Sequence, residues 1–139
     1  MAKSKVNWYD KNVMLEVENA TDDILTAAAF QVEGYAKVDA PVDTGFLRNA
    51  IYTVAADGES RRGKTDPDGY YKSKKTGQTS WHSKASQPPK KKHDAMVHAA
   101  ANYTIYNEMH KSFLYKALNK VKKEVNGIIK TVAKEHNLD

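Results

Sequence analysis

The apolar residues in the first third of the chain follow a helical period. Between Asp10 and Val38, apolar and small side chains recur at steps of three and four, which gathers them on one face of a helix. They are Val13, Val17, Ala20, Ile24, Ala27, Ala28, Gln31, Val32 and Tyr35. Asp10 is a suitable N-cap, and Pro41 disfavours a helical residue before it. The pattern predicts one amphipathic helix over residues 10–38.

A second apolar stripe with the same spacing lies between residues 114 and 132. It consists of Leu114, Ala117, Leu118, Val121, Val125, Ile128 and Val132. Lysines fill most of the positions between these residues, which makes the segment strongly amphipathic. Ser112 precedes the stripe and is suited to cap its first turn. We therefore expect a second long helix, with its apolar face in the core.

Two short stretches between the predicted helices favour β-strands. Residues 51–55 are rich in β-branched and aromatic side chains, and residues 95–100 alternate loosely between apolar and other positions. We expect them to pair as the arms of an antiparallel hairpin. The predicted order is helix, short turn, strand, long loop, strand, short helix, helix. This order indicates one α+β domain over residues 1–139, with a long N-terminal helix and a C-terminal helix packed on a small antiparallel sheet.

The segment 57–93 separates the two predicted strands and carries most of the excess positive charge. Its balance is +6, whereas residues 1–56 have −3 and residues 94–139 have +2, which together give the net +5. The segment has almost no aliphatic side chains, so it buries too little apolar surface to offset the entropy cost of ordering. We expect a long mobile basic loop. Tyr70, Tyr71 and Trp81 interrupt the polar run, which is typical of a short hairpin tip or a contact surface.

The composition excludes several classes of protein. Without cysteine the chain has no disulfide, thiol nucleophile or cysteine-built zinc site. No apolar run approaches the ~18 residues that a membrane-spanning helix needs, and the first residues lack an apolar secretory segment. We expect a soluble protein made in the cytoplasm, with no membrane contact. The histidines lack metal-ligand spacing, so we predict neither a metal nor a cofactor; they are His82, His93, His98, His110 and His136.

The most patterned stretch, residues 40–51, lies between the first helix and the first strand. Pro41 is placed to end the helix, and Asp43 or Thr44 to cap a short helical turn. Phe46 or Leu47 would anchor that turn on the core. This interpretation makes the stretch an architectural junction.

Asp43-Thr44-Gly45 is also the tripeptide of aspartic proteases, in which two carboxylates share a proton to activate water. Those enzymes are almost wholly β and have Ala or Ser after the glycine. Here Phe46 follows and two long helices flank the site. We therefore predict no catalytic residue and no enzymatic activity.

The same stretch resembles the A-P-V-D-T-G-x-L-R-x-S-I signature of a family of tailed-bacteriophage tail-completion, or head–tail joining, proteins. A second family motif, Y-A-x-Y-V-E followed by P-F-L-x-P-A-L, is similar to residues 103–108 and 112–118. The chain departs from these motifs at Ala50, Ser112 and Lys116. The matching positions are Pro41, Asp43, Thr44, Gly45, Leu47, Arg48, Tyr103, Tyr106, Phe113 and Leu114.

The resemblance implies a non-enzymatic virion protein of the neck, made in the cytoplasm of the host bacterium. Family members are small α+β subunits thought to assemble into a ring, commonly of six copies, at the head-proximal end of the tail. The expected partners are other copies of the chain, the tail-tube protein and the head connector or closure protein. A tail terminator and a head-side closure or adaptor protein are both consistent with this resemblance.

The basic residues of the central segment are candidates for partner binding. They are Arg61, Arg62, Lys64, Lys72, Lys74, Lys75, Lys90, Lys91 and Lys92. A head-to-tail ring needs two different complementary surfaces on each subunit, and the acidic first helix and the basic loop form one such pair. We favour an acidic protein surface on a neighbour. A basic DNA-binding module, which would contact phosphates through Lys and Arg, is the alternative, as is a loop that only contacts solvent.

Overall fold

The computed structural model describes residues 11–41, 45–57, 60–61, 69–83 and 91–138. The elements in chain order are α1 (Lys11–Asp39), α2 (Phe46–Asn49), β1 (Ile51–Val54), β2 (Ser60–Arg61), β3 (Gly69–Lys72), β4 (Thr79–His82), β5 (Met96–Ala99), α3 (Thr104–His110) and α4 (Leu114–Glu135). This arrangement confirms the predicted α+β class.

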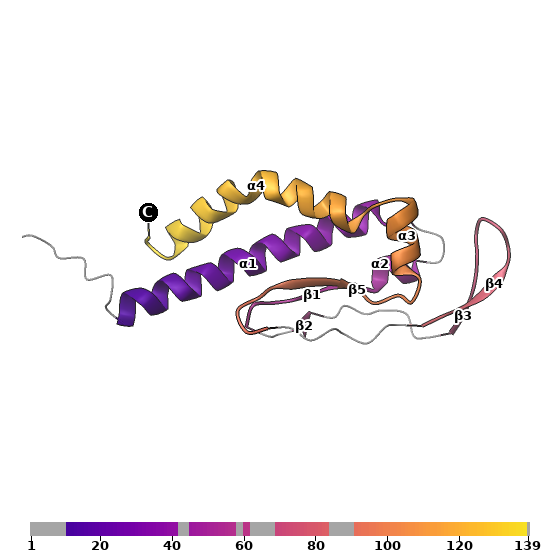
Figure 1. Cartoon of the computed structure of the whole chain (residues 1–139), viewed down its shortest axis with the longest axis horizontal. Coiled ribbons are helices and arrows are strands. Elements are labelled where there is room, and N and C mark those ends of the chain that lie inside the picture. The colour runs from indigo at the N-terminus through magenta and orange to yellow at the C-terminus, as the bar shows by residue number, and fades with distance from the viewer. Residues whose placement is uncertain (1–10, 42–44, 58–59, 62–68, 84–90, 139) are drawn as a thin grey trace, which may run out of the picture.

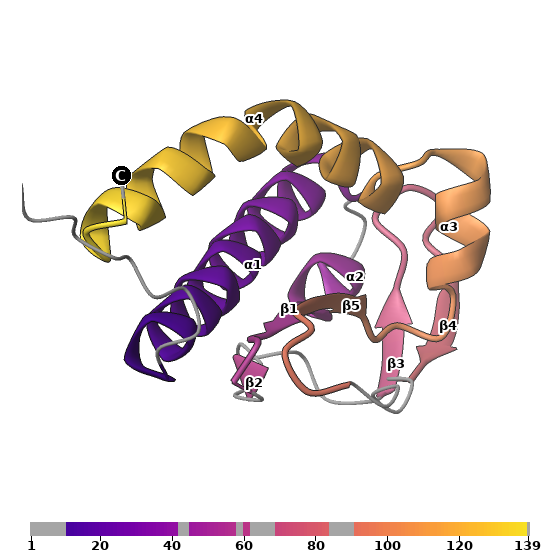
Figure 2. The same ribbon diagram turned by 60° about the vertical axis from the view of Figure 1, so that its left-hand side comes forward.

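The elements form three tiers, with α1 in the middle. Helix α4 packs along one side of α1, and the sheet lies against the other side (Figure 1). The turned view in Figure 2 shows that α4 and the sheet both lie against α1 and extend from it in different directions. The β3–β4 hairpin and α3 lie together at one end of the molecule, away from the C-terminal end of α4 (Figures 1 and 2). The middle helix therefore supports both outer tiers.

The sheet has the strand order β2-β1-β5, and both pairings are antiparallel. The register of β1 with β5 runs from Ile51 opposite Ala99 to Val54 opposite Met96, which confirms the predicted pairing of these two arms. All four residues of β1 are buried, as expected for the central strand of a covered sheet. The Thr53 hydroxyl, buried among apolar groups, donates to the Glu33 carboxylate of α1 at 2.7 Å. That bond satisfies a polar group that would otherwise be costly to bury.

The two long helices lie where the sequence predicts them, but the buried face of α1 differs from the prediction. Val17 and Gln31 are exposed, while Ala29 and Ala36 are buried against the sheet and α4. These alanines allow the backbone of α1 to approach both tiers closely, and a search for large apolar residues overlooks them. Within the described ranges, neither long helix has an uncharged apolar stretch of the length that a bilayer requires.

The central segment is more ordered than the sequence indicated. Residues 60–61 form β2 and pair with the end of β1, so they belong to the main sheet. Residues 69–83 contain the β3–β4 hairpin, in which Tyr70 lies opposite Trp81. Our expectation of a long loop across 57–93 was therefore wrong for residues 60–61 and 69–83, whereas the short hairpin that Tyr70, Tyr71 and Trp81 indicated is confirmed. The physical reason is that aromatic residues supply contacts that the scarce aliphatic residues do not.

Candidate functional site

The junction after α1 is built on a left-handed glycine and two buried apolar residues. Gly45 has φ 85°, a conformation that residues with a Cβ rarely adopt, and it immediately precedes α2. Phe46 and Leu47 are almost completely buried, which confirms that they anchor this turn, whereas Arg48 is exposed. Asp43 and Thr44, the predicted caps, lie outside the described residues. The described part of the motif therefore turns the chain from α1 into β1.

A cluster of rings around Phe46 attaches the β3–β4 hairpin to the body of the protein. The Phe46 ring centroid lies 5.1 Å from that of Tyr71 in β3 and 5.7 Å from that of His82 in β4. Tyr103, which precedes α3, lies 4.6 Å from His82 and 6.2 Å from Phe46. Such separations are typical of favourable aromatic pairs. The first motif, the hairpin and the tyrosine motif thus meet at one place.

The carboxylate of Glu108 organises the corner between α3 and α4. It accepts hydrogen bonds from the backbone N–H groups of Phe113, Leu114 and Tyr115, each at 3.0 Å, and from the Ser112 hydroxyl at 2.8 Å. These are among the first N–H groups of α4, which have no partner within the helix. We predicted Ser112 as the cap, and this was wrong: Glu108 caps the helix, and Ser112 donates to it.

Two opposing influences act on the pKa of Glu108. Partial burial raises the pKa, while the hydrogen bonds from Phe113, Tyr115, Leu114 and Ser112 lower it. The hydrogen bonds prevail, so the pKa of Glu108 lies below its usual value. Glu108 therefore caps α4 as an anion near neutral pH, which also suits the positive end of the helix dipole.

Some residues of the tyrosine motif are buried in the core, and others are exposed on the surface. Phe113 is completely buried and Leu114 is half-buried, whereas Tyr106 is 65% exposed. On the same helix, Ile105 and Met109 are 77% and 83% exposed. The residues Ile105, Tyr106 and Met109, here called the α3 patch, form an apolar surface that the described part of the chain leaves uncovered. Sequence reasoning missed Ile105 and Met109, although their spacing of four residues is a helical signal.

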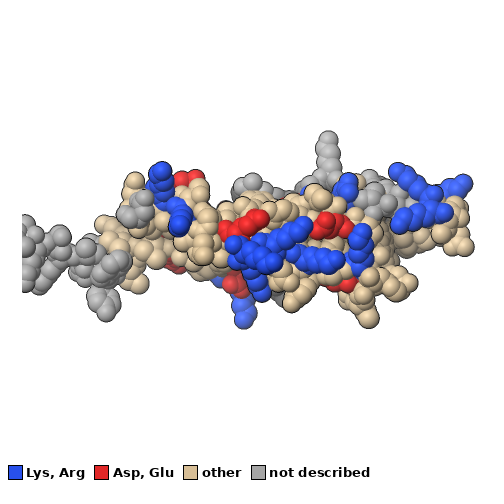
Figure 3. Space-filling model, turned by 90° about the horizontal axis from the view of Figure 1, so that it is seen from above, with Lys and Arg blue, Asp and Glu red and all other residues tan. Residues whose placement is uncertain are grey.

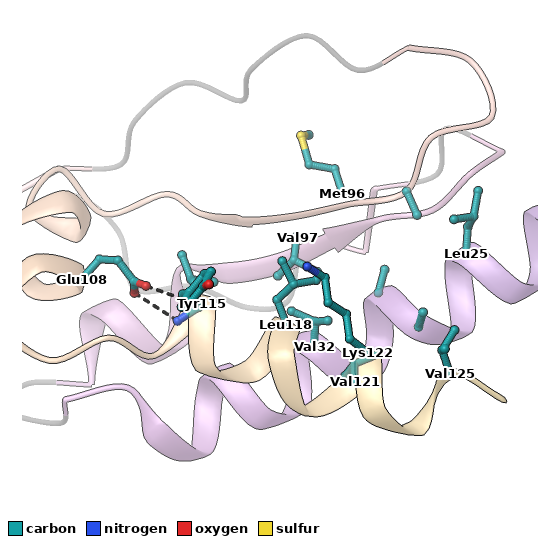
Figure 4. A pocket seen from close by; sticks show the side chains of 14 residues that line it. Leu25, Val32, Met96, Val97, Glu108, Tyr115, Leu118, Val121, Lys122 and Val125 are labelled. Carbon is teal, nitrogen blue, oxygen red and sulfur yellow. Dashed lines mark hydrogen bonds between the residues drawn. The ribbon is translucent and has the colours of Figure 1, made fainter. Parts of the chain in front are cut away.

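A groove with mostly apolar walls opens between α4 and β5, with α1 as its floor (Figure 4). It has a volume of about 670 Å³. Glu108 and Tyr115 lie at one end, and Leu25 and Val125 lie at the other (Figure 4). Its lining residues are Leu25, Ala28, Ala29, Val32, Ala95, Met96, Val97, Glu108, Leu114, Tyr115, Leu118, Val121, Lys122 and Val125. The predicted apolar stripe of α4 thus serves two surfaces, one in the core and one in this groove.

The hairpin carries three of the predicted partner-binding lysines, and all three are exposed. They are Lys72, Lys74 and Lys75, close to the exposed rings of Tyr70 and Trp81. Figure 3 shows basic side chains at this end of the molecule, apart from a band along α4. Lys91 and Lys92 are also exposed, and Arg61 lies in β2. Arg62, Lys64 and Lys90 lie outside the described residues.

The tip of the hairpin has a defined turn. The Ser73 hydroxyl accepts from the backbone N–H groups of Lys75 and Thr76 at 3.2 and 3.1 Å. Gly77 has φ 72°, which a glycine adopts at little cost. The Ser73 N–H donates to the Gln78 carbonyl at 2.7 Å and closes the turn. This local structure presents Lys74 and Lys75 at the tip.

Two histidines from other parts of the chain contact acidic side chains of α1. His136, just beyond α4, contacts Glu16 and, at 2.6 Å, Asp23; His93 contacts Glu18 and Asp22 at 3.0 and 2.9 Å. Hydrogen bonds to Glu16 and Asp23 raise the pKa of His136 above its usual value, although desolvation opposes the shift. Several acidic groups that we assigned to a neighbour's basic loop therefore contact histidines of the same chain.

Among residues 11–41, 45–57, 60–61, 69–83 and 91–138, no group of three or more His, Asp or Glu side chains is arranged to hold a metal ion. The groove, the α3 patch and the basic hairpin are the candidate functional surfaces, because they expose apolar or basic side chains suited to contacts with macromolecules. In comparisons with protein-family models, curated proteins and solved structures, nothing matched this chain.

Proposed function

We propose that this chain is a non-enzymatic virion protein that completes the head-proximal end of a phage tail and joins it to the head connector, acting as a ring of identical copies. One observation carries the proposal beyond the motif resemblance. Two separate apolar surfaces, the groove and the α3 patch, are left uncovered by the described residues. Surfaces of this kind mark sites of protein association.

Two different surfaces on one subunit are what head-to-tail assembly requires. When the surfaces differ, each copy engages one neighbour through the first and another neighbour through the second, and the series closes into a ring if the rotation permits. A subunit in such a ring needs a further surface for the proteins above and below. The basic hairpin, with Lys72, Lys74 and Lys75 at an end of the molecule, is suited to that contact.

The hairpin contact is proposed to be with an acidic protein surface on the tail tube or the connector. Exposed lysines gather on the hairpin beside the exposed rings of Tyr70 and Trp81, whose edge-to-face pairing gives them a fixed presentation. The same combination of rings and cations is found where proteins bind single-stranded nucleic acid. DNA is therefore the second candidate partner for this surface, and the experiment below includes it.

The proposal is tested with phage heads and tails assembled without this protein. Purified full-length chain is added, and joined particles are counted by electron microscopy. We expect joining to be restored, and we expect the triple variant Lys72→Glu, Lys74→Glu, Lys75→Glu to fail. The matched control reverses Lys123, Lys130 and Lys134 of α4, which are also exposed, lie outside the groove and change the net charge by the same amount.

One result would overturn the proposal: the wild-type chain restores no joining. If in addition the monomeric chain binds duplex DNA tightly and loses that binding in the hairpin variant, the protein is a DNA-binding module. Equal joining by the hairpin variant and the wild type would instead remove the hairpin from the neck contact.

A further inference from the structure

We propose that the groove between α4 and β5 binds an extended segment of a second copy of this chain, residues Val6–Tyr9, which adds to β5 as a further strand. This inference deepens the proposed function, on which it rests, by naming what one subunit of the assembly inserts into the next. Three observations support it: the edge of β5, the walls of the groove, and the position of Val6–Tyr9 relative to α1.

The outer edge of β5 is open at Val97 in the described part of the chain, whereas the carbonyl of Ala99 already accepts a hydrogen bond from the Thr104 hydroxyl at 3.1 Å. The sheet order β2-β1-β5 places β5 at its edge. The Ala100 N–H donates to the Ala50 carbonyl at 3.0 Å, and hydrogen-bonded pairs alternate along an antiparallel ladder. His98 and Met96 therefore direct their backbone groups toward β1, and Val97 directs its own outward. A further strand would pair with Val97, whereas a helix would leave this edge without hydrogen bonds.

The groove also supplies an apolar cover for the incoming strand. Leu118 and Val121 of α4 form the wall facing β5, and Leu25 and Val32 of α1 belong to the floor (Figure 4). A strand placed beside β5 would therefore lie beneath α4, with the side chains of one face in the groove. Leu25 and Leu118, now 38% and 41% exposed, would be covered. This combination of edge pairing and side-chain pockets is characteristic of strand addition.

Residues Val6–Tyr9 have the composition of such a strand. Val, Trp and Tyr are the residue types enriched in strands, and Val6 and Trp8 share one face because successive side chains alternate. Asn7 and Tyr9 share the other face. Val6 and Trp8 would thus enter the groove, while Asn7 and Tyr9 would face away from it. The segment precedes α1 and is outside the described residues.

The geometry of the chain assigns the segment to a neighbouring copy. Along α1, the groove begins at Leu25, about 21 Å from Lys11 at 1.5 Å per residue. Three residues separate Trp8 from Lys11, so its Cα lies within about 11 Å of Lys11 even in a fully extended chain. Trp8 therefore falls about 10 Å short of the near end of its own groove. A neighbouring copy has no such restriction, and the resulting contact is head-to-tail.

The first test measures self-association of the full chain by native mass spectrometry and sedimentation. We expect the variant Val6→Ser, Trp8→Ser to self-associate with an affinity at least about thirtyfold lower than that of the wild type. Loss of a buried Trp anchor commonly has an effect of this size. Tyr9→Ser, on the other face of the segment, is the matched control and should self-associate as the wild type does. Thermal unfolding, measured at dilutions where the chains are monomeric, should be unchanged in both.

The groove is tested with a matched pair on one helix. Leu118 and Ile129 are both 41% exposed on α4, but only Leu118 lines the groove. We expect Leu118→Asp to abolish self-association and Ile129→Asp to leave it intact. Mixing Leu118→Asp with the Val6→Ser, Trp8→Ser variant should then give a 1:1 complex and nothing larger, because the first variant retains only the segment and the second only the groove.

A disulfide test locates the contact directly, because the chain has no native cysteine. A Val6→Cys copy, which keeps the Trp8 anchor, should form a cross-linked heterodimer when mixed with a Leu118→Cys copy, and should form none when mixed with an Ile129→Cys copy. A wild-type chain that stays monomeric at every concentration would overturn the inference. Undiminished self-association of the Val6→Ser, Trp8→Ser variant would also overturn it.

The joining assay distinguishes failure of this inference from failure of the proposed function. A Val6→Ser, Trp8→Ser variant that self-associates and joins heads to tails as the wild type does would refute the proposed strand addition. It would leave the proposed joining function intact. Copies that cross-link through Val6→Cys and Leu118→Cys, while wild-type chain joins no particles, would support the added strand and refute the joining function.

Discussion

Two apolar regions of this protein are covered to very different extents. Around the junction, Phe46, Tyr52 and Phe113 have no exposed surface. Along the groove, Leu118 is 41% and Tyr115 is 63% exposed, although both belong to the helix that Phe113 precedes. The periodicity of a helix identifies an apolar face. It does not tell whether the same chain or another one covers that face.

The largest expected effect is on the free energy of unfolding, which a substitution at the junction should lower far more than one in the groove. Phe46→Ala should lower the free energy of unfolding by about 3–5 kcal/mol, because it removes a buried ring and leaves a cavity among Tyr71, His82 and Tyr103. Leu118→Ala should cost less than about 1 kcal/mol, because its side chain keeps much of its contact with water. Urea denaturation measures both values. Equal losses would contradict the distinction.

The second effect concerns Glu108, which lies at one end of the groove and accepts a hydrogen bond from the backbone of the buried Phe113. Glu108→Gln should lower stability by about 1–2 kcal/mol at neutral pH, since an amide replaces one accepting oxygen with a donor at the start of α4. The pKa of Glu108 is lowered in the folded protein, so its contribution is present above the ordinary value of 4.5 and is lost as the pH falls through the folded pKa. Unfolding curves of both proteins should therefore converge in acid.

A smaller effect uses two glycines in opposite situations. Gly127 lies in α4 with open space around it and lines no part of the groove, so Gly127→Ala should stabilise the protein by about 0.5–1 kcal/mol. Gly45→Ala should destabilise it by about 1 kcal/mol or more, because the left-handed conformation disfavours a Cβ. Thermal melting tests both signs. Self-association should be unchanged by Gly127→Ala.

The smallest effect depends on pH and tests how firmly the far end of α4 is attached to α1. The pKa of His136 is raised in the folded protein by Glu16 and Asp23. Its stabilising contribution is therefore fully present below the unfolded value of about 6.5 and is lost as the pH rises through the folded pKa. His136→Gln should melt earlier than the wild type near pH 6 and equally at alkaline pH. His110→Gln, which replaces an exposed histidine of α3, is the control substitution.

The sequence predicted the framework of the fold because the framework is periodic. The stripe of α4, the β-branched residues of β1 and the pairing of β1 with β5 all follow from spacing and side-chain type. The motif around Gly45 indicated a turn anchored by Phe46 or Leu47, and both are buried. The elements were predictable because each rests on neighbours within a few positions along the chain, and the pairing of β1 with β5 followed because these were the two predicted strands on either side of the central segment.

The remaining features depend on contacts between distant residues, which spacing does not reveal. Glu108 caps α4 from the helix before it, whereas the sequence placed a hydroxyl immediately before the stripe. Phe46 meets Tyr71 and His82 only because the hairpin returns to the junction. The groove likewise arises from the divergence of α4 from β5, so Val97 and Leu118 became candidates only once the tiers were known.

The position of α1 between the other tiers has a consequence for synthesis on the ribosome. About 75 residues separate the end of α1 from the start of α4, so α1 is made well before its main helical partner. At 5–20 residues per second, this interval lasts roughly 4–15 s. During that time α4, which covers the alanine-rich side of α1 in the folded protein, has not yet been synthesised. The nascent chain therefore passes through a stage in which the face of α1 that α4 covers in the folded protein is still exposed.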